Sequence, residues 1–386
     1  MTRLSGDWLE APATRAVCAA LRAGGHQAWF VGGCVRDALL GIPVGDIDIC
    51  TDARPDTVQA LAEAAGLKQI PTGIDHGTIT IVSGGVPHEV TTFRRDVETN
   101  GRHAVVAFAD TMDEDARRRD FTMNALYASP EGAVRDPLGQ GLADLAARRL
   151  RFIGDAETRI REDYLRTLRY FRFHARFADP QGGFDPEALA AIAATLDGLE
   201  TLSAERVGAE LTKLLCVTDP APALACMGQV GVLGRLLPGA EAKALAPLVH
   251  FEQATGTTPD WRCRLAALGG GDVGQALRLS KKDAATVALL RDAVGAMSGP
   301  AELGYRHGPV LAMQVILLRA ALLEMPPPPD AQARASFGAA QVFPVKAGDL
   351  PATVTGAEIG RTLRSLESRW ISSDFTLDRA GLLGEH

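Results

Sequence analysis

The stretch GGCVRDALLGIPVGDIDIC, residues 32–50, carries the features that decide the fold. An apolar run precedes it and predicts a buried strand that ends in two glycines. Gly32 and Gly33 would let backbone amides approach a phosphate, although a simple tight turn uses glycines in the same way. Asp46 and Asp48 stand at alternate positions of a second predicted strand and would share one face. Two such carboxylates need a cation between them, unless the strand is a solvated edge.

A third acid could complete a metal site. Glu89 lies in the segment GTITIVSGGVPHEVTTF, whose alternating residues predict a β-hairpin around Gly84-Gly85. It would join Asp46 and Asp48 if this hairpin packs beside the DIDIC strand, and would otherwise be an exposed strand residue. Carboxylates beside a phosphate-suited turn fit metal-dependent phosphoryl transfer, and oxygen ligands of this kind suit Mg²⁺.

Composition limits the class of protein. The chain has 386 residues, 46% of them hydrophobic, a formal net charge of −7, and six cysteines without a C-x-x-C pair. The N-terminus lacks the apolar core of a signal peptide, and no apolar run reaches the length of a membrane span. These features predict a multidomain cytoplasmic protein with reduced thiols and no membrane partner.

The pattern along the chain predicts an α+β head followed by an all-helical remainder. Strand and helix signals mix up to about residue 140, and helical spacing dominates after it. Between the head motifs, residues 94–115 form a polar segment in which Asn100-Gly101 marks a turn. We interpret this segment as a surface loop.

Five motifs in order resemble the signature of class II tRNA nucleotidyltransferases and bacterial poly(A) polymerases, members of the DNA polymerase β-like superfamily. They are FVGGCVRDALLG with DIDICT, RRDFTMNALYA, DPLGQGLADL, EDYLRTLRYFRF and LSAERVGAEL. The resemblance implies a polymerase β-like catalytic head at residues 1–138 and a helical neck with a nucleotide-selecting helix at 139–216. It further implies a helical body at 217–298 and a helical tRNA-binding tail at 299–386. The family's flexible loop, which helps to switch the site from C to A addition, would correspond to the polar segment.

The resemblance also assigns roles to individual residues. Asp46 and Asp48 would bind the catalytic metals, with Glu89 as the third carboxylate. Four residues would hold the triphosphate end of the nucleotide: Gly32, Gly33, Arg36 and Asp37. Three residues would face its ribose and phosphates: Arg119, Asp120 and Asn124. The base would be read by Asp163 and Arg166, and Arg169 would contact phosphate or base.

The choice of base follows from hydrogen-bond chemistry. Asp163 and Arg166 are predicted to be neighbours at i and i+3 on one helix. A carboxylate only accepts hydrogen bonds and a guanidinium only donates them. Cytosine and adenine present an amino donor beside a ring-nitrogen acceptor, whereas uracil and guanine present the reverse pattern. The pair would therefore accept C and A, although an ordinary surface ion pair has the same spacing.

The local charge of one segment supports an RNA substrate, although the net charge of the whole chain is negative. Residues 117–176 contain thirteen arginines and no lysine against eight acids. The resemblance implies template-independent addition of C, C and A to the 3′ end of tRNA from CTP and ATP, with release of pyrophosphate. It implies no protein partner. The alternative within the family is a poly(A) polymerase, and an inactive domain that only binds RNA is a further alternative. A small-molecule nucleotidyltransferase would not need so long a helical remainder.

Overall fold

The computed structural model describes residues 2–74, 77–100 and 103–384. The chain forms two compact units, the first made of Met1–Val217 with Gln229–Leu236 and the second of Thr218–Gly228 with Leu237–His386. Within the described residues, no helix has both the length and the apolar character needed to cross a lipid bilayer. The predicted fold class, an α+β head followed by helices, is confirmed.

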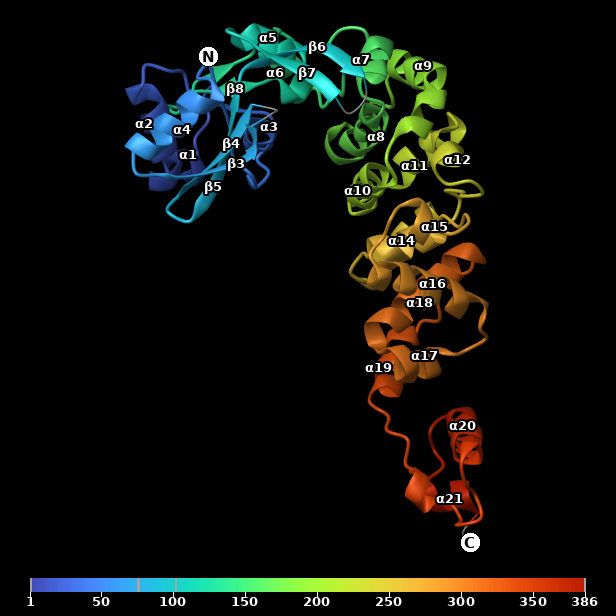
Figure 1. Ribbon diagram of the computed structural model, residues 1–386. Helices are drawn as coiled ribbons and strands as arrows, with labels where there is room; N and C mark the ends of the chain where they lie inside the picture. The colour runs from blue at the N-terminus through green and yellow to red at the C-terminus, as the bar shows by residue number, and fades with distance from the viewer. Residues whose placement is uncertain (1, 75–76, 101–102, 385–386) are drawn as a thin grey trace. The chain divides into compact units, whose positions relative to one another are not determined.

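A seven-stranded mixed sheet forms the head of the first unit, with the strand order β3-β4-β5-β2-β1-β8-β9 (Figure 1). Its strands are β1 (Trp29–Val31), β2 (Asp48–Thr51), β3 (Lys68–Gly73), β4 (Thr78–Ser83), β5 (Val86–Thr92), β8 (Tyr127–Ala128) and β9 (Val134–Arg135). The predicted hairpin around Gly84-Gly85 is confirmed as β4 and β5. β2 and β5 run parallel with Asp48 in register with Glu89, so the sheet brings these two carboxylates together.

The strand that carries Asp48 is shorter than its sequence predicts. β2 begins at Asp48, so Asp46 lies before the strand, and the prediction that both aspartates share a strand face is wrong. In the β2–β5 register, the residue opposite Asp46 would be Pro87, which has no N–H to donate to a ladder. Pairing therefore stops before Asp46 is reached.

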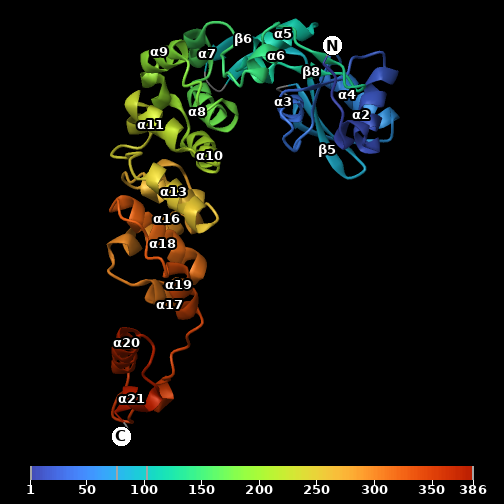
Figure 2. The same cartoon turned by 180° about the vertical axis from the view of Figure 1, so that it is seen from behind.

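Helices cover both sides of this sheet. α2 and α4 lie side by side on one face and α3 lies on the other (Figures 1 and 2). The helices of the first unit are α1 (Asp7–Glu10), α2 (Pro12–Ala23), α3 (Gly33–Leu39), α4 (Pro55–Ala64), α5 (Met112–Arg117), α6 (Gly141–Ala146), α7 (Ala156–Glu162), α8 (Leu165–Phe177), α9 (Pro186–Ala194), α10 (Ala204–Leu215) and α12 (Val232–Leu236), with the 3₁₀ turns η2 (Thr122–Asn124) and η3 (Leu196–Thr201).

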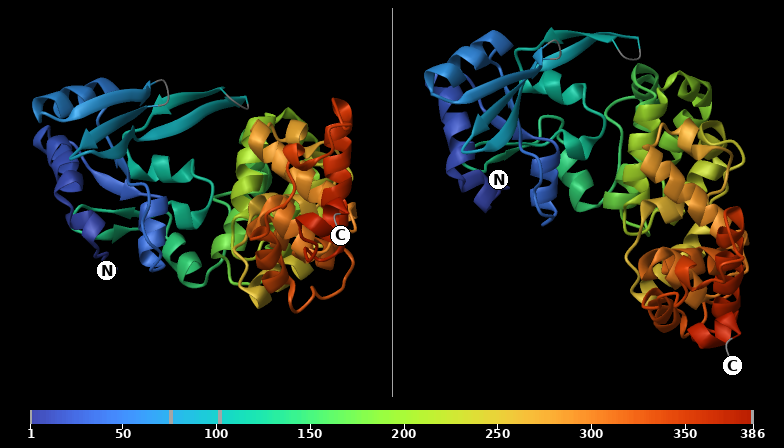
Figure 3. Two further views of the ribbon diagram at one scale, coloured as in Figure 1. Left: turned by 90° about the horizontal axis from the view of Figure 1, so that it is seen from below. Right: turned by 60° about the horizontal axis from the view of Figure 1, so that its bottom comes forward.

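The polar segment after β5 forms a second, two-stranded sheet. β6 (Arg94–Asn100) pairs antiparallel with β7 (His103–Phe108), and this hairpin extends away from the head (Figure 3). The interpretation as a loop is therefore wrong, because valines in both arms favour extended backbone. Of the predicted turn Asn100-Gly101, Gly101 lies outside the described residues.

Aromatic side chains join the head segment after α5 to helix α8. The ring of Phe121 lies 5.0 Å from that of Phe152 and 5.2 Å from that of Phe173, and Tyr170 stacks on Phe152 at 5.5 Å. Phe121 and Tyr170 are fully buried. Aromatic contacts of this kind add to the free energy gained from apolar burial. The residues around Phe121 and those of α8 therefore share one core.

The second unit is built from helices. They are α11 (Ala221–Gln229), α13 (Leu245–Thr255), α14 (Trp261–Ala267), α15 (Val273–Ala276), α16 (Lys281–Gly295), α17 (Pro300–His307), α18 (Pro309–Leu322), α19 (Ala331–Ala339), α20 (Ala357–Ser372) and α21 (Arg379–Leu383), with the 3₁₀ turn η4 (Ala347–Asp349). α17 and α19 meet closely through glycines: a Cβ on Gly304 would lie 2.0 Å from the Ala335 carbonyl oxygen, and one on Gly338 would lie 1.8 Å from that of Ala301. The division of the chain at residues 138, 216 and 298 stays a prediction.

Candidate active site

A glycine turn connects β1 to α3. Gly32 has a φ of 72°, in the left-handed region that favours glycine, and α3 begins at Gly33. The side chain of Arg119 reaches this turn, because a Cβ on Gly32 would lie 3.4 Å from its Nη1 atom. A backbone suited to phosphate and a guanidinium therefore lie together, as the motifs predicted.

Asp48 and Glu89 lie on the neighbouring strands β2 and β5, and Asp46 lies just before β2. Asp48 is partly buried, whereas Asp46 and Glu89 are exposed. Burial, followed by the negative charges of Glu89 and Asp46, raises the pKa of Asp48 to about 6, and the charge of Arg119 acts in the opposite direction. In the described part of the chain, no three His, Cys, Asp or Glu side chains are arranged as a complete metal site. The predicted three-carboxylate cluster thus stays a prediction.

The donor set nevertheless fits a hard divalent cation. Burial and, after it, repulsion from Glu89 and Asp46 disfavour the charged form of Asp48, and a bound cation would offset both effects. Carboxylate oxygens are the ligands that such cations prefer. The chemistry of these side chains therefore fits a divalent cation at this end of β2.

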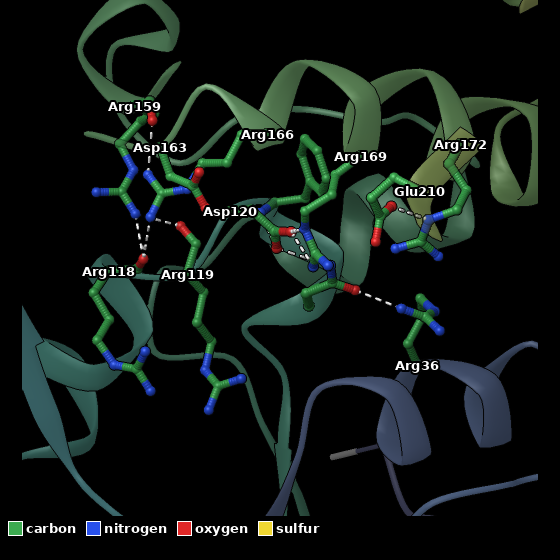
Figure 4. A network of polar contacts seen from close by, with 12 residues as sticks. Arg36, Arg118, Arg119, Asp120, Arg159, Asp163, Arg166, Arg169, Arg172 and Glu210 are labelled. Carbon is green, nitrogen blue, oxygen red and sulfur yellow. Dashed lines mark hydrogen bonds and ion pairs between the residues drawn. The ribbon is translucent and has the colours of Figure 1, made fainter. Parts of the chain in front are cut away.

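A chain of polar contacts runs from α3 to α8 (Figure 4). Arg36 donates from Nη1 to the Asn124 side chain at 2.7 Å, and Asn124 donates to Asp120 at 2.9 Å. Asp120 accepts from Nε of Arg169 at 2.8 Å. Burial opposes the charged form of Asp120, but Arg169 and the hydrogen bonds outweigh it and lower the pKa of this carboxyl. Four residues predicted to bind nucleotide are thus brought together.

Arg36 is more enclosed than a phosphate-binding arginine needs to be. Only 6% of it is exposed, its guanidinium lies 4.0 Å from the ring centroid of Phe177, and its Nε donates to Asp37 at 2.8 Å. The contact with Phe177 connects α3 to α8. Both side chains already have protein partners. Their predicted contact with triphosphate stays a prediction.

Asp163 and Arg166 are not neighbours on one helix. α7 ends at Glu162, Asp163 has extended backbone, and α8 begins at Leu165. The Asp163 carboxylate accepts from the backbone N–H of Leu165 at 3.1 Å, which is the local bond that makes aspartate favourable at helix starts. The predicted i, i+3 helical pair is therefore wrong, although both residues lie at the junction of the two helices.

Each of the two residues predicted to select the base has its own protein partners. Asp163 accepts from Nη2 of Arg206 on α10 at 2.8 Å. Arg166 donates to Glu162 and, at 2.9 Å, to the backbone carbonyl of Arg159. It also donates to the backbone carbonyl of Arg118 at 3.3 Å (Figure 4). The Asp163 carboxylate and the Arg166 guanidinium thus pair with different residues and not with each other.

The sequence interpretation missed three supporting residues. They are Arg206, Glu162 and the buried Arg159, which donates to the backbone carbonyls of Arg118 and Arg119. Only Glu162 carried a usable signal, its i, i+4 spacing to Arg166. Arg206 is 43 residues from Asp163, a distance at which no periodicity connects two side chains.

Comparison with known proteins bears on the same segments. Residues 28–151 match the family described as "Poly A polymerase head domain", and residues 183–243 match "Probable RNA and SrmB- binding site of polymerase A". The first match contains the glycine turn, Asp48 and Arg119. The second contains Arg206.

Individual relatives extend the likeness over most of the chain. The CCA-adding enzyme of Geobacillus kaustophilus (strain HTA426) is 33% identical over 375 residues, which are 93% of this chain and 88% of that protein. Human CCA tRNA nucleotidyltransferase 1, mitochondrial, is 44% identical over 191 residues, and the chain spans 44% of that relative's length. The crystal structure of Bacillus stearothermophilus CCA-adding enzyme in complex with CTP matches with a TM-score of 0.73 at 29% identity, covering 94% of this chain and 93% of that one.

Sheet, glycine turn and strand-end carboxylate together define a class, the nucleotidyltransferases with a polymerase β-like catalytic head. Within this class, the chain belongs to the family of class II CCA-adding enzymes. The identification rests on likeness over nearly the whole chain in both sequence and fold, and it confirms the family predicted from the motifs.

Proposed function

We propose that this protein adds C, C and A to the 3′ end of tRNA, using CTP and ATP and releasing pyrophosphate. The observation that carries the proposal is the separate support of Asp163 and Arg166. Because Arg206 holds the acceptor and Glu162 holds the donor, both keep capacity for a nucleobase. Relatives named as CCA-adding enzymes support the same activity.

The remaining hydrogen-bonding capacity fits cytosine and adenine. Arg166 has five N–H donors, and its contacts within the described part of the chain use three of them. A base with an amino donor beside a ring acceptor satisfies both residues. Uracil or guanine would leave buried polar groups unpaired, at a cost of about 1–3 kcal/mol for each group. Selection of C and A then needs no nucleic acid template.

We also propose Mg²⁺ as the metal, held by Asp46, Asp48 and Glu89. When bound, such an ion activates the attacking hydroxyl and neutralises charge on the leaving pyrophosphate. The protein's own part is to hold the triphosphate at the glycine turn, with Arg119 beside it. Arg169, Asp120 and Asn124 would keep the ribose side of the site in place.

The RNA partner would be tRNA, bound through the helical parts of the chain, with the tail at residues 299–386 contributing. The arginine-rich region from residue 117 to 176 supplies positive charge beside the base-selecting residues. A cytoplasmic location remains a prediction, since relatives with mitochondrial names share the same sequence pattern.

A nucleotide-addition assay tests the proposal. Purified protein is given tRNA that lacks its CCA end, with CTP alone, ATP alone, or both. We expect two additions with CTP alone and three with both nucleotides. Long A tails without C incorporation would contradict CCA addition and identify a poly(A) polymerase. Binding of tRNA without any addition would identify the inactive RNA-binding alternative.

A further inference from the structure

Asp115 is a fully buried carboxylate directly beneath the RRD segment of the head. It is the third residue from the C-terminal end of α5, and three side chains donate hydrogen bonds to it. Its Oδ1 accepts from Nε of Arg118 at 2.8 Å, and its Oδ2 accepts from Nη2 of Arg119 at 2.9 Å and from the hydroxyl of Tyr127 at 2.8 Å. So many partners are expected when a charge must stay ionised away from water.

The electrostatics agree with this arrangement. Burial acts to raise the pKa of Asp115, but Arg119, Arg118 and the Tyr127 hydroxyl outweigh it and hold the pKa well below its ordinary value. Asp115 is therefore a permanent anion at the centre of the cluster. It is the last residue of the polar segment 94–115, and the motif-based interpretation gives it no individual role.

The orientation of Arg119 shows what this anion does. Its Nε and Nη2 atoms face Asp115, and Nε also approaches the Tyr127 hydroxyl at 3.3 Å. The third nitrogen, Nη1, makes none of these bonds and lies at the glycine turn, 3.4 Å from where a Gly32 Cβ would be. One edge of the guanidinium is thus fixed and the other points to the expected phosphate seat. The positive charge of Arg119 also acts to lower the pKa of Asp48.

A second contact connects Asp115 to the β6–β7 hairpin. The backbone N–H of Arg94, the first residue of β6, donates to Oδ1 of Asp115 at 3.4 Å. The carboxylate that fixes Arg119 therefore also holds the base of the hairpin. Asp115 alone thus contacts both Arg119 and the backbone of Arg94.

We propose that Asp115 is a positioning residue that aims Arg119 at the triphosphate of the incoming nucleotide. The proposal rests on the proposed nucleotidyl transfer, because it requires a nucleoside triphosphate at the glycine turn. A free arginine side chain loses rotamer freedom when it binds a ligand. The two hydrogen bonds from Nε and Nη2 of Arg119 to Oδ2 of Asp115 remove much of that freedom before the ligand arrives. CTP and ATP share the triphosphate, so this positioning acts on both nucleotides by the same factor and leaves base choice to Asp163 and Arg166.

The test compares Asp115→Asn with a matched control, Glu157→Gln. Glu157 also pairs with an arginine four residues ahead, Arg161, but on the exposed side of α7. For Asp115→Asn we expect the KM values for CTP and ATP to rise by the same factor, about tenfold, with CTP-over-UTP discrimination unchanged. Binding of inorganic tripolyphosphate, measured by calorimetry at fixed Mg²⁺ without tRNA, should weaken by about the same factor. The control should change none of these quantities.

A double-variant cycle separates positioning from general damage. If Asp115 acts through Arg119, Asp115→Asn should weaken tripolyphosphate binding little further in an Arg119→Met background. Additive losses would overturn the proposal, as would unchanged tripolyphosphate binding or unequal changes for CTP and ATP. Should Asp115→Asn not fold, Tyr127→Phe removes only the hydroxyl that contacts both side chains. We then expect a two- to threefold loss of tripolyphosphate binding, and no loss would overturn the proposal.

The two proposals can fail separately. Wild-type protein that binds tripolyphosphate in this manner but adds only A to RNA would contradict CCA addition and leave the role of Asp115 intact. Wild-type protein that adds CCA, with tripolyphosphate binding indifferent to Asp115, would contradict only the positioning role.

Discussion

The carboxylate of Asp163 is held by the guanidinium of Arg206, with 2.8 Å between Oδ2 and Nη2. The two residues come from different helical segments and lie 43 positions apart. This pairing leaves Arg166 to its own partner, Glu162. The acceptor and the donor that would read a base are therefore both available, which an Asp163–Arg166 ion pair would have prevented.

Arg206→Met should weaken base selection. Without its partner, Asp163 is free to rotate or to pair elsewhere, and one oriented acceptor is lost. We expect discrimination between CTP and UTP, measured as the ratio of kcat/KM values, to fall about tenfold, equivalent to about 1.4 kcal/mol. Arg235→Met is the control, because the ion pairs of Arg235 within the described residues are with the exposed acids Asp197 and Glu200. Equal ratios for both variants would contradict a role of Arg206 in base selection.

Metal binding at Asp48 should depend on pH. A metal ligand must be deprotonated, and the pKa of Asp48 is about 6 without a metal. Because protons compete for the carboxylate below this value, Mg²⁺ affinity measured by calorimetry should fall between pH 7.5 and pH 5. Asp48→Asn should weaken Mg²⁺ binding at both pH values and lower kcat by about a hundredfold or more, while tRNA binding is kept. Mg²⁺ affinity that does not change across this pH range would show that Asp48 is not a ligand.

Gly32→Ala should impair nucleotide binding beyond its cost in stability. The left-handed φ of Gly32 costs a residue with a side chain about 1–2 kcal/mol, and the new Cβ would meet Arg119 Nη1 at 3.4 Å. Gly25→Ala is the matched control, with a φ of 80° and nothing within 4 Å of its Cβ. Urea unfolding should show similar losses for both variants, whereas only Gly32→Ala should raise the KM for CTP and ATP. A similar rise in KM for both would assign the effect to strain alone.

Arg264→Met should destabilise the second unit in a pH-dependent way. Arg264 and Glu252 form an ion pair in which both residues are almost fully buried, with 2.7 Å between Nη2 and Oε2. Removing the arginine leaves a buried carboxylate and should cost about 3–5 kcal/mol of unfolding free energy near neutral pH. Burial already raises the pKa of Glu252, and Arg264 lowers it, so the variant raises this pKa further.

The sign of the pH effect follows from this shift. A carboxyl whose pKa is raised in the folded state favours folding at low pH and loses that contribution as pH rises through the folded-state pKa. The stability lost in Arg264→Met should therefore be smaller at pH 5 than at pH 8, as measured by urea unfolding. Adding Glu252→Gln should remove the difference between the two pH values. A loss that is equal at both pH values in the single variant would contradict an ionised, unpaired Glu252.

Much of the fold and part of the site could be predicted from short stretches of sequence. Gly32-Gly33, the apolar run before them and the hairpin at Gly84-Gly85 are local signals, because turn geometry and strand alternation act over a few residues. The ordered motifs added the family, which likeness over 93% of the chain confirms. Local signals failed where a strand needs a partner, as at Asp46, and where one predicted helix is divided into two, as at Asp163 between α7 and α8.

The sequence by itself determined the α+β head, the helical remainder and the family, since backbone preferences and motif spacing are written in consecutive positions. It also supplied the prediction of which residues carry chemistry. Only the tertiary structure decided which other residues keep those side chains in place. Arg206 supports Asp163 across 43 positions, and Arg36 donates to Asn124 across 88. Such partners are chosen by packing between elements, and two charges far apart in sequence meet only after the chain has folded.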